Sequence, residues 1–304
     1  MEFLQGIMPE KSVLIFMGVN ILMAWGFWIM VATGQLSLGN SAFMAMGAYG
    51  SGVVTVRWGL PLPFGFLGAI VIGAVAGAIV GWPALRIRGI YLAMATIGVE
   101  EVLQIFFKNF EYTGANVGFN GMRGTTPELV YAVVFVFFLF LLKLSTSRFG
   151  RAMEAIRSDE VAAGAMGLNP TYVKMVAFII GAVMSSIAGV LYAHFMFFIA
   201  PEHFRIMQSI LPVLFVTLGS VETFWGAAFG AIILTLLPEY LRFMAEWRIV
   251  LYGLLIILVM AVRPQGIISR SVVVRIGHLF RGSAASGQPQ PAVAGSGGPG
   301  QSSS

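Results

Sequence analysis

Long apolar segments make up most of this sequence. Eight candidate membrane spans lie near residues 12–32, 41–56, 62–83, 90–107, 129–144, 171–198, 209–238 and 249–262. A helix needs about 20 apolar residues to cross the hydrocarbon layer, and no segment alternates as a membrane β-strand does. Only 10% of the 304 residues are charged, against about 25% in soluble domains. We therefore predict an all-α polytopic membrane protein with about eight hydrophobic segments, and we exclude a soluble fold or a nucleic-acid partner.

The few charges indicate how the chain is oriented. Arg86 and Arg88 follow the third span, five basic residues outnumber three acidic ones in the connection 143–174, and four arginines without any acid follow the last span. Lys and Arg collect on the cytoplasmic side of a membrane protein. We therefore expect these three regions, and with them the C-terminus, to be cytoplasmic.

This orientation makes residues 209–238 leave and rejoin the same side of the membrane. Thirty residues are too few for two full crossings, so we predict a broken, re-entrant element. A second Gly-rich interruption precedes the short span at 41–56. Interrupted helices in both halves are typical of transporters built from inverted repeats. Six residues at the two breaks are therefore candidates for the transport pathway: Gln35, Ser37, Gly39, Gly219, Ser220 and Glu222.

The connection at 145–170 is amphipathic and charged. Its small apolar residues recur at helical spacing, which predicts a pair of short helices on the cytoplasmic side. We expect Asp159 and Glu160 to begin the second helix and Asn169-Pro170 to end it. Ala152, Ala163 and Met166 would then need a partner to cover them. An ordinary solvated loop is the alternative.

The same connection carries a family resemblance. Glu160-x-Ala162-Ala163-x-x-x-Gly167 resembles the E-A-A-x-x-x-G coupling loop of ATP-binding-cassette (ABC) importer permeases, and the residues before it resemble those of branched-chain amino acid permeases of the LivM/LivH type. Motifs near 34–49, 85–103, 201–210 and 263–266 agree in order. The resemblance implies an ATPase-coupling loop formed by Arg148, Gly150, Arg151, Glu154, Arg157, Asp159, Glu160, Ala163 and Gly167.

The resemblance also implies partners and a location. The chain would be a permease subunit in a bacterial inner membrane, with no catalytic residues of its own, and would import branched-chain or related amino acids. It would pair with a homologous LivH-type permease or a second copy of itself. Two ABC ATPase subunits would carry the ATP and Mg, and an extracytoplasmic solute-binding protein would deliver the substrate.

The residues themselves limit the energy source. A P-loop needs Gly before its Lys, and the four lysines follow Glu10, Phe107, Leu142 and Val173. This chain is therefore expected to hold no nucleotide or other cofactor. With no cysteine and three histidines far apart in sequence, it is also expected to hold no metal.

An ion-coupled secondary transporter or channel is the alternative function. A carboxylate inside the membrane is a functional candidate, and the fourth span carries two, Glu100 and Glu101. Neighbouring helix residues point about 100° apart, so only one of them can face a common cavity. We select Glu101 as the pathway candidate because it matches the family motif.

Two domains are expected. Residues 1–281 form the transmembrane permease domain. Residues 282–304 are a Gly/Ser/Pro-rich tail with no charge, a composition typical of disorder.

Overall fold

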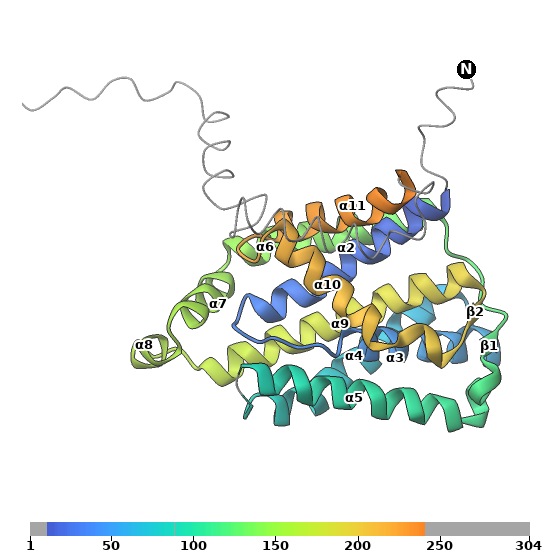
Figure 1. Ribbon diagram of the computed structural model, residues 1–304, viewed down its shortest axis with the longest axis horizontal. Coiled ribbons are helices and arrows are strands. Elements are labelled where there is room, and N and C mark those ends of the chain that lie inside the picture. The colour runs from blue at the N-terminus through green and yellow to red at the C-terminus, as the bar shows by residue number, and fades with distance from the viewer. Residues whose placement is uncertain (1–10, 88, 241–304) are drawn as a thin grey trace, which may run out of the picture. The chain divides into compact units, whose positions relative to one another are not determined.

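The computed structural model describes residues 11–87 and 89–240, which form an almost entirely helical bundle (Figure 1). The predicted all-α class is confirmed. The helices are α2 (Lys11–Val31), α3 (Asn40–Gly52), α4 (Leu62–Ala84), α5 (Ile90–Asn109), α6 (Pro127–Thr146), α7 (Arg148–Ser158), α8 (Glu160–Ala165), α9 (Pro170–Met196), α10 (Ile206–Gly219) and α11 (Phe224–Tyr240). A π-helical turn, Val53–Arg57, extends α3, and a 3₁₀ turn, Pro201–Phe204, precedes α10.

Five of the described helices are long and apolar enough to cross a membrane alone: α2, α4, α5, α6 and α9. The second predicted span corresponds to α3 and its π-helical turn, and the seventh to the bent pair α10 and α11. The eighth, 249–262, lies outside the described residues, as do the tail at 282–304 and the C-terminus. The count of eight segments therefore remains a prediction.

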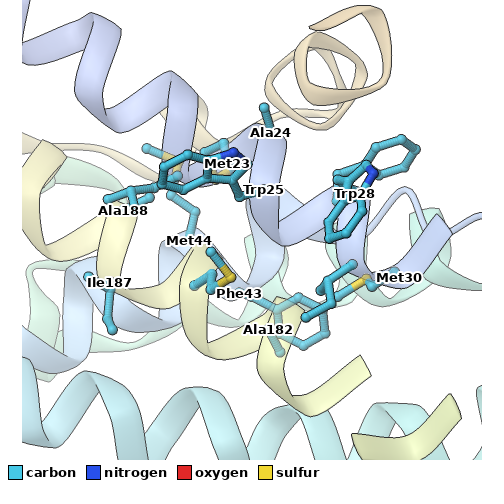
Figure 2. Packing of buried hydrophobic residues seen from close by; sticks show 14 of the residues in the cluster. Met23, Ala24, Trp25, Trp28, Met30, Phe43, Met44, Ala182, Ile187 and Ala188 are labelled. Carbon is cyan, nitrogen blue, oxygen red and sulfur yellow. The ribbon is translucent and has the colours of Figure 1, made fainter. Parts of the chain in front are cut away.

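Helix α9 is the centre of the bundle and packs against α2, α3 and α4. Figure 2 shows the core where α2, α3 and α9 meet, with Trp25, Phe43, Met44 and Ile187 among its buried side chains. The backbones approach so closely that a Cβ atom on Gly47 of α3 would overlap the Ser186 carbonyl of α9. Such approach through small residues is how membrane helices associate.

Both predicted breaks are present. The first separates α2 from α3 and contains residues 32–39. The second, residues 220–223, separates α10 from α11 and turns the chain by 115°. Helices α10 and α11 then pack on each other at Gly219, Gly226 and Gly230, where a Cβ atom would meet the backbone of the other helix. The second break is held by α2, because the indole of Trp28 donates to the Val221 carbonyl at 3.0 Å.

The two ends of the bundle differ. Helices α7 and α8 lie at one end, and the two-residue strands β1 (Phe119–Asn120) and β2 (Phe198–Ile199) pair at the other (Figure 1). The strands are antiparallel, with Phe119 opposite Ile199. They join the connection after α5 to the connection after α9, which predicts that both connections lie on one side of the membrane.

Candidate functional site

Residues 145–170, called the coupling segment below, fold into the expected pair of helices. The Ser147 hydroxyl accepts from the Gly150 amide at 3.1 Å and begins α7. The Asp159 carboxylate accepts from the amides of Val161 and Ala162, at 2.9 and 3.0 Å, and begins α8. A side-chain oxygen in this position satisfies amides that a helix leaves without a partner. The carboxylate predicted to begin the second helix therefore does so.

The predicted end of the second helix is wrong. Helix α8 stops at Ala165, and Asn169-Pro170 begins α9, where the Asn169 side chain accepts from the Tyr172 amide. The residue that stops α8 is instead Gly167, just after the C-cap residue Met166, with a φ of +86°. The amides of Gly167 and Leu168 donate to the carbonyls of Gly164 and Ala163. This pair of bonds is the Schellman motif, in which glycine takes the left-handed position.

The coupling segment exposes charge together with some apolar surface. Arg148, Arg151, Glu154, Arg157 and Asp159 are exposed. Among the apolar residues expected to need a partner, Met166 is 73% exposed, Ala152 is half-buried and Ala163 is only 1% exposed. Ala163 is therefore covered by its own chain, which corrects that part of the prediction. Gly150 also has an internal role, because a Cβ atom there would overlap the Leu144 carbonyl.

Each helix of the coupling segment is connected to one of the two breaks. Arg157 of α7 donates to the Val221 carbonyl in the second break at 3.2 Å. Glu160 of α8 forms an ion pair of 2.8 Å with Lys174 of α9. The carbonyl of Lys174 in turn accepts from the side-chain amide of Gln35, in the first break, at 2.9 Å.

The first break and helix α10, which precedes the second break, also meet α5 deeper in the bundle. The Leu38 amide, at the end of the first break, donates to the Thr96 hydroxyl at 2.8 Å. One turn further along α5, Glu100 accepts from the Ser209 hydroxyl of α10 at 2.8 Å. Ser209 accepts in turn from the Ser41 amide in the first turn of α3, at 2.9 Å. We call Ser41, Thr96, Glu100 and Ser209 the polar cluster.

The two adjacent carboxylates of α5 point in different directions, as predicted. Glu100 is 2% exposed and belongs to the polar cluster, whereas Glu101 is exposed on the outer face of α5. The assignment of Glu101 to the pathway remains a prediction. Glu100, Thr96, Ser41 and Ser209 were not among the site residues predicted from the sequence. The four-residue spacing of Thr96 and Glu100, which places both on one helix face, was the available signal.

The other predicted pathway residues lie within or beside the breaks. Gln35, Ser37 and Gly39 are buried in the first break, and Gly219 and Ser220 are buried at the second. Glu222 is exposed, and its amide donates to the Ser220 hydroxyl at 3.1 Å. Within residues 11–87 and 89–240, no group of three His, Asp or Glu side chains is placed to hold a metal ion.

These features define a class of protein. Apolar helices surround two broken segments, polar groups join those segments inside the bundle, and a charged helix pair contacts both of them at one end. Interrupted helices of this kind are typical of membrane transporters. The class is a multi-pass transport permease.

Comparison with known proteins gives the family. Residues 11–260 match the family model of the permease component of branched-chain amino acid transport systems, and the chain belongs to this family. It is 30% identical over 287 residues to the high-affinity branched-chain amino acid transport system permease protein LivM of Salmonella typhimurium, covering 82% of this chain and 68% of that protein.

Two further relatives show the breadth of the similarity. The chain is 28% identical to the permease protein LivH of Escherichia coli K12, over 78% of this chain and 81% of LivH. It is 25% identical to the autoinducer 2 import system permease protein LsrC of an Enterobacter strain, over 79% of this chain and 74% of LsrC. No solved structure matches the chain.

Proposed function

We propose that this chain is the membrane-spanning permease subunit of an ABC importer for branched-chain or related amino acids, located in a bacterial inner membrane with its C-terminus in the cytoplasm. The observation that carries the proposal is the match to the branched-chain permease family over residues 11–260. An extracytoplasmic binding protein would deliver the amino acid. The chain has no P-loop of its own, so ATP and Mg would bind to two partner ATPase subunits.

The contacts of the coupling segment support a mechanism. ATPase subunits that dock on α7 and α8 would move Arg157 and Glu160, and each of these residues is connected to a different break. The helices that follow the first break and precede the second, α3 and α10, are joined again through Ser41, Ser209 and Glu100. A displacement at the coupling segment would therefore reach both broken segments and alter the contact between them.

A second permease and the ATPase subunits would cover the exposed surfaces of this chain. The transport pathway would lie between this chain and a second permease, either a LivH-type homologue or another copy. An exposed carboxylate is expensive against lipid, so Glu101 would face that second permease or the pathway. The exposed Val161 and Met166 would be covered by the ATPase.

Reconstitution tests the function against an ion-coupled transporter. Proteoliposomes that contain the full set of subunits should accumulate leucine only under two conditions. ATP must be present on the side of the membrane where the ATPase subunits lie, and leucine-loaded binding protein must be present on the opposite side. The permease alone should take up no leucine under a proton or sodium gradient. Leucine uptake by the purified chain driven by an ion gradient, without ATP, would contradict the ABC proposal.

A further inference from the structure

Glu100 has an oxygen atom without a partner in the interior of the bundle. Its Oε2 atom accepts from Ser209, but its Oε1 atom is buried and forms no hydrogen bond. Neither ion pair seen among residues 11–87 and 89–240, Lys174–Glu160 and Arg205–Glu202, involves Glu100, so no basic side chain in this part of the chain is seen to neutralise it. A buried carboxylate without a counter-charge is costly, and inside a membrane it marks a functional position.

A second unpartnered group lies beside it. The Tyr49 hydroxyl of α3 is buried and has no hydrogen-bond partner. Tyr49 and Glu100 line the same small cavity, together with Ala42, Ala45, Leu103, Gln104, Phe107, Pro201 and Phe204. The two side chains therefore line one cavity, although they come from helices α3 and α5.

The remaining walls of the cavity are aromatic and aliphatic. The ring of Tyr49 stacks on Phe107 with centroids 4.2 Å apart and lies 6.0 Å from the ring of Phe204. Aromatic faces attract cations. A carboxylate, a hydroxyl and aromatic rings together favour a ligand with a cationic group that donates hydrogen bonds and an apolar remainder.

We propose that this cavity receives the ammonium end of the amino acid during transport, held by Glu100 and Tyr49, with the aliphatic side chain against Leu103 and Phe107 and the carboxylate outside the cavity, on the side of the half-exposed Leu103 and Gln104. This inference rests on the proposed function and adds the group of the substrate that the permease recognises. The ammonium supplies the missing counter-charge of Glu100 and donates to both free oxygens.

The cavity is too small for an amino acid in this conformation. Its volume of about 10 Å³ accommodates one water molecule at most. We expect Phe204 and Pro201, which line the cavity just before α10, to move away from Tyr49 when an amino acid enters. Because Ser209 of α10 is bonded to Glu100, binding at this site and movement of the second broken element are linked.

Two substitutions test the site with minimal change of shape. Glu100→Gln keeps an oxygen that can accept from Ser209 but removes the negative charge. Tyr49→Phe keeps the stacked ring and removes a hydroxyl that has no partner in the structure. The matched control is Glu128→Gln, the same chemical change at an exposed carboxylate in the first turn of α6.

The measurement is thermal stabilisation of the purified full complex, without binding protein, by L-leucine and by 4-methylpentanoate, which is leucine without its ammonium group. Wild type and Glu128→Gln should be stabilised by leucine only. Glu100→Gln and Tyr49→Phe should lose this response while keeping the wild-type midpoint without ligand. In proteoliposomes, leucine uptake should fall at least about tenfold for Glu100→Gln, which loses a charged hydrogen-bond partner.

The outcomes separate this inference from the proposed function. Equal responses to leucine and 4-methylpentanoate, no response of the wild type, or wild-type behaviour of Tyr49→Phe would each overturn the ammonium site. Tyr49→Phe decides the matter if Glu100→Gln does not fold. Failure of the wild-type complex to accumulate leucine at all would instead contradict the proposed function.

Discussion

Arg157 of α7 donates a hydrogen bond of 3.2 Å to the main-chain carbonyl of Val221, 64 residues further along the chain. The same carbonyl accepts from the indole of Trp28 on α2. An exposed, charged helix is thereby bonded directly to the non-helical turn between α10 and α11. Backbone carbonyls in such a turn have no helical partner, and here side chains from α2 and α7 supply the hydrogen bonds.

Arg157→Ala should uncouple ATP hydrolysis from transport. The substitution removes the bond to Val221 but leaves the turn held by Trp28, so the protein should still fold and assemble. We expect leucine uptake per ATP hydrolysed to fall about tenfold, corresponding to the roughly 1.5 kcal/mol of one hydrogen bond to a charged group. Uptake and phosphate release are measured in the same proteoliposomes.

Arg205→Ala is the control for this loss. It also removes an exposed arginine, one that pairs with Glu202 at the other end of the bundle, 3.3 Å away. Exposed pairs of this kind contribute about 0–1 kcal/mol, and the ratio of uptake to hydrolysis should not change. A wild-type ratio for Arg157→Ala would refute the role of the bond to Val221.

Charge reversal at Glu160 tests the link from α8 to the first break. Glu160→Lys places two positive charges where the ion pair with Lys174 now lies, and Lys174 is the residue whose carbonyl holds Gln35. We expect uptake to be lost while the protein still inserts. The exchange Glu160→Lys with Lys174→Glu restores opposite charges and should recover much of the uptake. If the double variant is as inactive as the single one, the pair itself does not carry the coupling.

Ser209→Ala should destabilise the bundle and reduce uptake. It leaves Glu100 with two unpartnered oxygens and the Ser41 amide without its acceptor, at roughly 1–3 kcal/mol for each stranded group. Ser51→Ala is the comparison, because this buried hydroxyl donates only to the Ala48 carbonyl of its own helix. Thermal unfolding should show a clearly larger loss for Ser209→Ala, and equal losses would contradict the bridging role of Ser209.

The breaks could be predicted from the sequence because their causes are local or simple to count. Thirty residues cannot cross a bilayer twice, and glycines mark where the helices stop, as the end of α10 at Gly219 confirms. The helices of the coupling segment could also be predicted from the sequence, because Asp159 is a strong helix-capping residue at the start of an amphipathic stretch. Its end was misplaced because Asn169-Pro170 signals both the end of one helix and the start of the next.

Apart from the shared helix face of Thr96 and Glu100, the polar cluster could not be predicted, because it depends on tertiary contacts. Ser41, Glu100 and Ser209 come from three helices, and no spacing within one helix brings them together. The choice between Glu100 and Glu101 depends on how α5 is rotated in the bundle. In the structure, this rotation buries Leu92, Ala93, Thr96 and Phe107 on one face. The rotation could not be predicted because the apolar residues of α5 are spread too evenly around the helix.

Gly167→Val should impair coupling through a change of backbone conformation alone. The residue has a φ of +86°, and no atom lies within 4 Å of an added Cβ, so the substitution meets no steric obstacle outside its own backbone. A β-branched residue in the left-handed region costs about 1–2 kcal/mol, which should loosen the end of α8 and misplace its ion pair with Lys174.

Gly164→Ala is the matched control, because this site is equally open but lies within helix α8, where Ala is favoured over Gly by about 1 kcal/mol. We expect reduced leucine uptake per ATP for Gly167→Val and unchanged uptake for Gly164→Ala. The opposite ranking would mean that bulk at the docking surface, rather than the left-handed turn, limits coupling.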